Sequence, residues 1–427
     1  MRHTPTAVLA LSLSLLAACS DDPSAPAPTI VTPVTAVVAF CAGLEPAWVA
    51  FQDGDGAWTR AEPEAAGPLV TFRRTFSADR AGIATASRSA SGLTTLSVRY
   101  AAPGELAQFG DTSPRSCDPA PRTLLGTVAG LGANEAAFVS AGVSTNRDLA
   151  FPADGGAFTI RDLTAGPQDL LATRATLIDG AATTTGMILR RGIDLPDGAT
   201  VPVLDFASAE VFQPAARTVT LVGLGPEGAF TQSSFRTTRS EHVVAFVTSQ
   251  PTAATRAYLA IPDARLQPGD VQALLATTAP TEGHVRRTTA LYFRTPADRT
   301  LTLGALPIAP TLAIEASTPT LRPRARLVQQ ADYDRLTSVA WQQGPNTIVT
   351  VSMTPEYAAR STGGYDLIVP ELTGVSGFDP AWALRAGGGT LLWTVGRIGG
   401  SLGLATDVVP KDGDTRRGAG DGGVFTP

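Results

Sequence analysis

The sequence predicts an all-β protein built from three to four tandem β-sandwich domains behind a disordered tether. Short runs of alternating apolar and polar residues recur along the chain, whereas few segments sustain the apolar period of a helix. Glycine and proline number 42 and 33 among 427 residues, as expected when many strands are joined by tight turns. Charged residues make up only 17%, below the roughly 25% typical of soluble domains.

The N-terminus has the pattern of a bacterial export signal. Arg2 and His3 form a short basic start, and an apolar run follows over residues 7–18. This run is too short to cross a bilayer as a helix, so we interpret it as a signal peptide. Residues 16–19 (LAAC) resemble the lipobox of bacterial lipoproteins. The resemblance implies cleavage before Cys19 and lipidation of its thiol, and the alternative is an ordinary secretory signal with a chance cysteine.

The same resemblance implies a location for the mature chain. Acyl chains on Cys19 would hold the protein stably at a membrane surface. In the lipoprotein family the residue after the cysteine influences sorting, and Ser20 favours the outer membrane. Residues 19–35 are rich in Pro, Ala, Ser and Thr without apolar periodicity, which predicts a flexible tether. We therefore expect a lipid-anchored protein of the cell envelope, periplasmic or surface-facing.

Charge and cysteine content narrow the function further. The net charge is −5 and the sequence pI about 5.4, so the chain lacks the basic character of nucleic-acid-binding proteins.

The mature chain keeps Cys41 and Cys117 besides Cys19. Two remaining thiols in an exported protein most simply form a disulfide, and the alternative is two buried, unreactive thiols.

Turn signals and composition divide the chain into consecutive segments. Within the first β domain, the DGDG sequence at residues 53–56 separates two strand-like runs and predicts a hairpin turn. The C-terminal end is polar and Gly-rich, which predicts disorder. The predicted segments are the signal peptide (1–18), the tether (19–35), an N-terminal β domain (36–118), three sandwiches (119–212, 213–308 and 309–409) and a disordered tail (410–427).

One of these segments resembles the carboxypeptidase regulatory-like, or prealbumin-type, β-sandwich. The resemblance covers about fifty residues, and it rests on a Gly-x-Val strand at 126–128, a Gly-Gly-Ala-Phe stretch at 155–158 and a short Gly turn at 165–167 that leads into a final strand. It implies a scaffold and not a catalyst. A related pattern recurs at 217–225 and 269–276, which indicates an internal repeat about ninety residues long.

Several motifs suggest chemistry but do not have the partners that the chemistry needs. Residues 399–403 match the G-x-S-x-G pattern of serine hydrolases, but no histidine follows His284. Residues 223–228 match a dinucleotide-binding glycine pattern, but a poor helix opening follows them. His242 and His284 are the histidines of the mature chain, and we expect both to be surface or strand residues. The sequence therefore predicts no catalytic residue, no metal site and no cofactor.

The predicted hairpin contains the most calcium-like arrangement of acids. Aligning Gly56 with the turn glycine of a calcium loop places Asp53, Asp55 and Glu62 at ligand positions. Position one of such a loop would be Phe51, which has no side-chain oxygen. Alternating apolar residues on both sides also favour a plain hairpin over flanking helices.

Trp48 and Trp58 flank this turn and offer two interpretations. Exposed indoles could form an aromatic platform for a sugar ring, whereas buried indoles would fill the core of the first domain, which is the interpretation we favour.

The sequence as a whole predicts a non-catalytic binding, adhesion or structural module at the cell envelope. Its expected partners are the membrane, through the anchor, and a glycan or an envelope protein. Two alternatives stay open: a carbohydrate-binding lipoprotein that uses Trp48 and Trp58, and a hydrolase whose carboxylate pair the sequence does not single out.

Overall fold

The structure is a computed structural model, and it describes most of the chain after the tether. The described residues are 32–106, 117, 121–143, 145–178, 181–194, 196–246, 252–279, 285–361, 364–404 and 408–427. Cys19, the signal peptide, most of the tether and His284 lie outside them. Strand β1 (Val34–Cys41) begins inside the segment predicted as tether.

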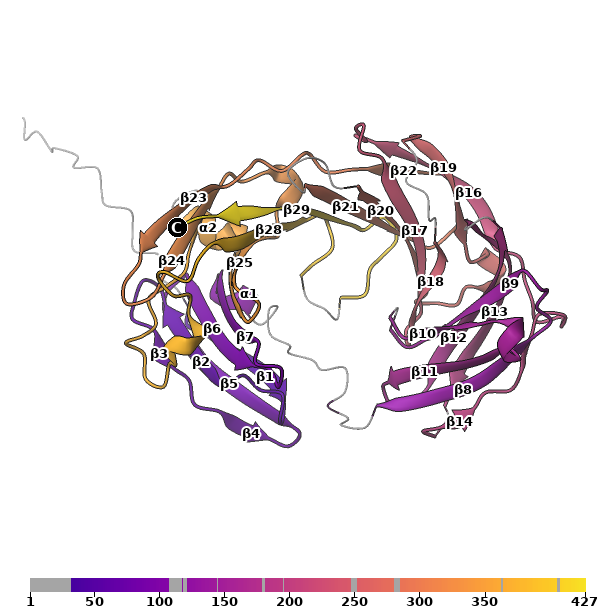
Figure 1. Cartoon of the computed structure of the whole chain (residues 1–427), viewed down its shortest axis with the longest axis horizontal. Helices are drawn as coiled ribbons and strands as arrows, with labels where there is room; N and C mark the ends of the chain where they lie inside the picture. The colour runs from indigo at the N-terminus through magenta and orange to yellow at the C-terminus, as the bar shows by residue number, and fades with distance from the viewer. Residues whose placement is uncertain are drawn as a thin grey trace, which may run out of the picture. The chain divides into compact units, whose positions relative to one another are not determined.

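The all-β prediction is confirmed, because strands make up most of the described residues (Figure 1). The helices among them are short. They are α1 (Pro103–Leu106), α2 (Pro355–Ser361) and the 3-10 turns η1 (Pro152–Asp154), η2 (Asp263–Arg265), η3 (Ala331–Tyr333) and η4 (Pro380–Trp382).

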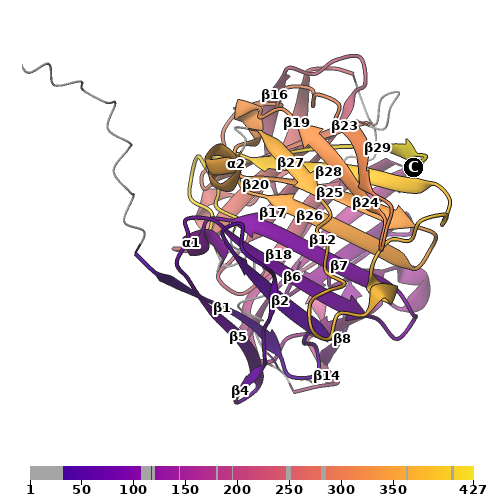
Figure 2. The same cartoon turned by 90° about the vertical axis from the view of Figure 1, so that its left-hand side faces the viewer.

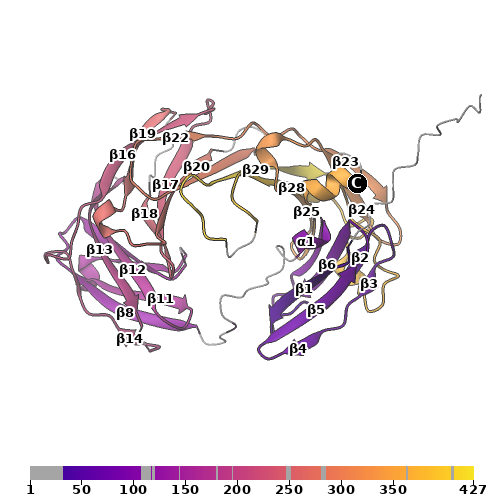
Figure 3. The same cartoon turned by 180° about the vertical axis from the view of Figure 1, so that it is seen from behind.

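A twelve-stranded sheet is the central feature of the fold, and Figures 1 and 3 follow it from one end to the other. Its strands, in spatial order, are β18 (Glu241–Phe246), β17 (Ala229–Arg236), β20 (Val271–Thr278), β21 (Arg286–Phe293), β29 (Thr415–Phe425), β28 (Leu391–Gly399), β25 (Leu336–Gln343), β26 (Thr347–Met353), β7 (Thr94–Ala101), β6 (Ala81–Arg88), β2 (Trp48–Asp53) and β3 (Thr59–Arg60).

Three small sheets accompany this large sheet. They are β1–β5–β4, with β5 (Leu69–Phe76) and β4 (Glu64–Ala66); β19–β16–β22, with β19 (Thr255–Ala260), β16 (Ala215–Val222) and β22 (Arg299–Thr302); and β23–β24–β27, with β23 (Thr311–Ala316), β24 (Arg322–Leu327) and β27 (Tyr365–Ile368).

The segment predicted as the 119–212 sandwich has two sheets of its own around one apolar core. They are β10 (Arg147–Ala150), β9 (Glu135–Ala141), β12 (Gln168–Ile178) and β13 (Ala181–Ile193) on one side, and β11 (Ala157–Leu163), β8 (Arg122–Ala129) and β14 (Ala199–Thr200) on the other, with β15 (Leu204–Asp205) also paired to β8.

Glycines in this sandwich explain the motif that the sequence analysis singled out. A Cβ atom at Gly126 would overlap the ring of Phe158 on the neighbouring strand. Gly156 has a positive φ of 72°, and a Cβ there would collide with the carbonyl oxygen of Val128. These glycines therefore permit close packing of β8 against β11 and the turn before it.

The 213–308 segment repeats the strand arrangement of the 119–212 segment. β8 and β16 each lie between an antiparallel neighbour and a parallel one. The neighbouring sheets also correspond, since β10–β9–β12–β13 has the same order as β18–β17–β20–β21. The internal repeat is thus visible in the topology, although in the second copy this sheet continues into the twelve-stranded one.

The twelve-stranded sheet crosses the predicted domain boundaries. β7, from the first segment, pairs in parallel with β26, from the last, in continuous register from Thr94 opposite Thr347 to Tyr100 opposite Met353 (Figure 2). The two segments also share one apolar core, in which Trp48 is 2% exposed and Trp341 is fully buried. The first and last segments are therefore parts of one folded body and not two independent sandwiches.

The prediction of a disordered tail after residue 410 is wrong. β29 lies in the middle of the sheet, between β21 and β28, and Phe425 packs against Trp341 at 6.0 Å between ring centroids. The glycines that suggested disorder make room for neighbours, because a Cβ at Gly423 would lie 3.1 Å from the indole nitrogen of Trp393. Sequence composition alone does not distinguish such packing from disorder.

Deleting residues 414–427 should therefore destabilise the whole body. The truncation removes a central strand together with Phe425, so its cost should at least match the loss of a large buried side chain, about 3–5 kcal/mol. Thermal unfolding followed by circular dichroism would measure it. Removal of Thr426 and Pro427 alone is the control and should leave the melting temperature unchanged; an unchanged melting temperature in the longer truncation would contradict the placement of β29.

Candidate functional site

A groove of about 570 Å³ lies at one end of the shared core. Three turns meet there: the one between β6 and β7, the one between β25 and β26, and the loop that follows η4. The amide of Thr94 donates to the carbonyl oxygen of Asn346 at 2.8 Å, which ties the first two turns together. The groove is thus a product of the β7–β26 pairing, since that pairing brings the first two turns side by side.

The third wall of the groove is held by a side chain from the second turn. Gln343 accepts a hydrogen bond from the amide of Arg385 and donates to its carbonyl oxygen, both at 2.8 Å. A Cβ at Gly388 would overlap the Gln343 amide, so glycine at 388 leaves space for this clamp. The loop carrying Arg385 is therefore fixed to the sheet by two reciprocal hydrogen bonds.

The aromatic surface of the groove comes from Trp382. This residue ends η4, whose first turn is capped by the Asp379 carboxylate accepting from the amide of Ala381 at 2.9 Å. The Trp382 indole is half-buried and packs on Phe378 and Trp48, at 5.5 and 6.2 Å between ring centroids. A ring supported from behind in this way keeps its orientation while its remaining surface lines the groove.

The charged groups of the groove are mainly cationic. Arg88 and Arg385 are exposed, and neither guanidinium has an ion pair with a described carboxylate. Asp379 also lines the groove, but one of its oxygens serves the η4 cap. The groove therefore offers two available guanidiniums, the Asn346 side-chain amide and an indole to a ligand.

The aromatic platform, which is the alternative to the favoured core interpretation of Trp48 and Trp58, does not form. Trp48 is buried in the core and its indole nitrogen donates to the carbonyl oxygen of Ser376 at 3.1 Å. Trp58 is half-buried over Gly82, where a Cβ would lie 2.9 Å from the ring, and its ring lies 6.2 Å from that of Tyr100. Both indoles serve packing, because Trp48 contacts Phe378 and Trp382 of the 371–384 segment and Trp58 contacts Tyr100. Trp382, which the sequence analysis did not select, is the indole that lines the groove.

The hairpin at residues 53–56 is confirmed, since β2 and β3 pair across it. Its acids bind protein groups and not one another. Asp53 accepts from the amides of Ser77 and Ala78, and although burial alone would raise its pKa, these hydrogen bonds hold the pKa of Asp53 below its usual value. Asp55 pairs with Arg80 at 2.5 Å.

Glu62 has a different partner from Asp53 and Asp55, since it pairs with Arg60 at 3.3 Å. Among the residues that the structure describes, no group of three or more His, Cys, Asp or Glu side chains is placed to hold a metal ion.

The structure brings Cys41 and Cys117 together as a disulfide, with 5.3 Å between their Cα atoms. The bond closes a loop that contains β2 to β7. It therefore ties the end of β1 to the chain that follows α1, within the body that carries the groove.

A second polar cluster, made by Ser140, Asp169, Arg191, Ser240 and His242, joins the two repeated segments. The Ser140 hydroxyl and His242 Nδ1 are 2.9 Å apart, and Ser240 Oγ accepts from the amide of Asp169 at 2.8 Å. Arg191 pairs with Asp270 at 2.6 Å.

This cluster resembles a serine–histidine pair, but its setting is structural. Ser140 is 7% exposed and His242 is fully buried, so the hydroxyl has no open approach for a substrate. Burial lowers the pKa of His242 to about 4, with nearby Arg191 acting in the same direction and Asp169 opposing it. His242 is therefore a neutral strand residue that helps to join two segments of the chain.

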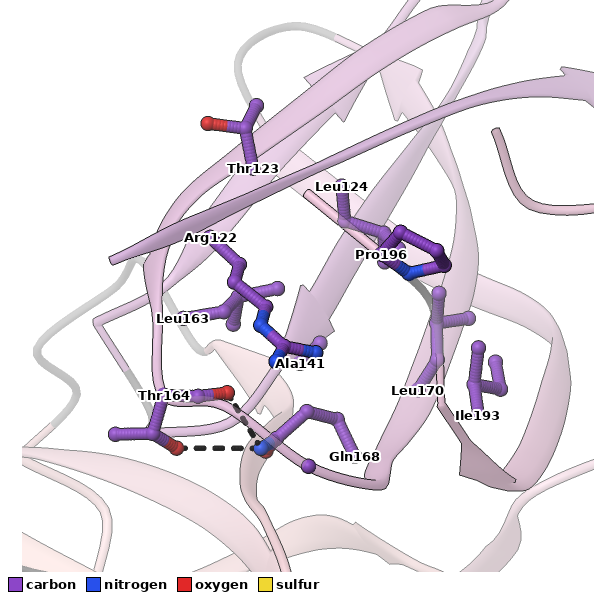
Figure 4. A pocket seen from close by; sticks show the side chains of 11 residues that line it. Arg122, Thr123, Leu124, Ala141, Leu163, Thr164, Gln168, Leu170, Ile193 and Pro196 are labelled. Carbon is purple, nitrogen blue, oxygen red and sulfur yellow. Dashed lines mark hydrogen bonds between the residues drawn. The ribbon is translucent and has the colours of Figure 1, made fainter. Parts of the chain in front are cut away.

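A smaller cavity, of about 20 Å³, opens at one end of the 119–212 sandwich (Figure 4). The polar residues that line it include Gln168, whose amide nitrogen donates to two oxygens of Thr164, as the dashed lines show. The Gln168 oxygen is buried without a hydrogen-bond partner among the described residues. The space suits about one water molecule and is too small for a ligand.

Comparisons with known proteins add no family or relative to this geometry. No family model matches the chain, and a search of curated proteins finds no match. In the described part of the chain, no helix has both the length and the apolar character needed to cross a membrane.

The buried cluster predicts a pH dependence of stability. Because His242 has a folded pKa of about 4, below the ordinary value of 6.5, the unfolded chain binds the proton more readily. The contribution of neutral His242 to the free energy of unfolding should be complete above about pH 6.5. It should fall by the order of 3 kcal/mol as the pH drops towards 4.

Urea unfolding between pH 4 and 7 would measure this effect in the wild type and in His242→Gln. The variant lacks the titrating group, so the difference between the two proteins should shrink as the pH falls. Parallel pH profiles would show that His242 is not buried as described.

Proposed function

We propose that this chain is an exported, lipid-anchored binding protein of the cell envelope with no catalytic role. The groove at Trp382 is the observation that most directly supports it. Its volume of about 570 Å³ lies within the roughly 300–1,000 Å³ of small-ligand sites, and its lining combines an aromatic face with a few polar groups. The lipobox-like residues 16–19 support the anchor, and Ser20 favours the outer membrane.

The chemistry of the groove favours binding over hydrolysis. Hydrolysis of a glycosidic bond by the common route needs two carboxyl groups on either side of that bond. Asp379 supplies one, and it already accepts the amide hydrogen bond of the η4 cap. The Ser140–His242 pair, the other arrangement with catalytic residue types, is buried away from the groove's lining.

A carbohydrate is the ligand class that the groove favours, in a place different from the hairpin suggested by the sequence. The half-buried Trp382 ring offers a face on which the C–H groups of a sugar can stack. The side-chain amide of Asn346 supplies a donor and an acceptor of the kind that sugar hydroxyls need. A glycan-binding envelope lipoprotein is therefore our more specific proposal.

The anchor is tested by Cys19→Ala. Without the thiol, the chain cannot be lipidated, so the variant should lose membrane association and cleavage of the lipoprotein type. Cell fractionation followed by immunoblotting measures both. Ser20→Ala is the control and should still pellet with membranes; a Cys19→Ala protein that pellets like the wild type would refute lipid anchoring.

The groove is tested by a glycan array probed with the mature chain. Wild-type protein should bind a subset of glycans, and Trp382→Ala should reduce that signal by up to about tenfold, since stacking on an aromatic ring is worth about 0.5–1.5 kcal/mol beyond the area that it buries. Trp58→Ala is the matched control, because it removes a half-buried indole outside the groove and should leave binding intact. Absence of wild-type binding across the array, or its loss only in Trp58→Ala, would overturn the proposal.

A further inference from the structure

We propose that the groove recognises an acidic saccharide whose carboxylate groups pair with Arg88 and Arg385. This inference rests on the proposed binding role of the groove and adds the class of its ligand. It goes beyond the sequence, in which these two arginines are indistinguishable from the others.

The guanidiniums of Arg88 and Arg385 differ from many others in having no ion-pair partner among the described residues. Many arginines of the body already have a carboxylate partner, including Arg190 with Glu210 at 2.8 Å and Arg191 with Asp270 at 2.6 Å. Arg88 and Arg385 have none among the described residues, although both line the same groove. Two guanidiniums that line one groove and have no ion-pair partner among the described residues favour an anionic ligand, and their planar donors fit a carboxylate.

The backbone positions of Arg88 and Arg385 are fixed before a ligand binds. Arg88 ends β6, a strand paired on both sides, and the reciprocal bonds from Gln343 fix the backbone of Arg385. The bases of both side chains are therefore held by the sheet before any ligand arrives. A preorganised pair loses less conformational entropy on binding than two arginines on free loops.

The arrangement of strands at the groove favours a saccharide over an acidic peptide. Extended peptides commonly bind by adding a strand to an open sheet edge. The β6, β7, β25 and β26 strands at the groove all have neighbours on both sides, so their ends contribute turns and no open edge. A groove lined by an indole, two guanidiniums and the Asn346 side-chain amide instead matches a ring that carries hydroxyl and carboxylate groups.

Isothermal titration of the mature chain with trigalacturonate tests the inference, and the methyl ester of the same trisaccharide is the matched ligand control. The acid should bind and the ester should bind at least about tenfold more weakly, because each charged hydrogen bond is worth on the order of 1.5–3 kcal/mol. Arg88→Gln and Arg385→Gln should each weaken binding of the acid about tenfold, and raising the salt concentration should weaken it further. Arg161→Gln removes an exposed arginine that lies outside the groove and has no carboxylate partner among the described residues, and it should change nothing.

The outcomes separate this inference from the proposed function. Equal binding of acid and ester, lost in Trp382→Ala, would overturn the acidic class and leave a glycan-binding groove. Binding of poly-glutamate in place of trigalacturonate, dependent on the same arginines, would also overturn it in favour of a peptide. No binding of trigalacturonate by a protein that binds neutral glycans on the array would overturn the acidic class alone, whereas no binding in either experiment would overturn both.

Discussion

Strand β7 lies parallel to β26 in the middle of the large sheet, and the rest of the body depends on this pairing. It joins residues that lie some 250 positions apart in the chain, so it forms only when both ends of the protein have folded together. The pairing closes the core around Trp48 and Trp341. It also sets the β6–β7 and β25–β26 turns side by side, which creates two walls of the groove.

Close packing in this protein relies on glycine at several contacts between strands. Gly82 accommodates Trp58, Gly126 accommodates Phe158, and Gly423 accommodates Trp393. In each case a large ring occupies space that a Cβ would fill. The high glycine content therefore reflects ring-to-backbone packing as well as turns, which is why reading the 410–427 segment as disordered was wrong.

The two polar clusters have different roles because their burial differs. Ser140 and His242 lie between packed segments, where the hydroxyl is paired with Nδ1 of a neutral imidazole. Arg88, Arg385 and Trp382 lie where turns end and the core stops, so their polar groups stay available to a ligand. The lipobox-like N-terminus would place this surface at a membrane, which suits recognition of a large or immobile ligand in the envelope.

The amino-acid sequence by itself determined the all-β class and the hairpin at residues 53–56, because alternation and turn residues are local signals. It also indicated the internal repeat, which the strand order shows. Only the tertiary structure decided that the first and last segments share one sheet, that β29 is a central strand, and that Trp382 and not Trp48 faces the groove. Pairing partners and burial depend on contacts between distant residues, and a local pattern does not contain that information.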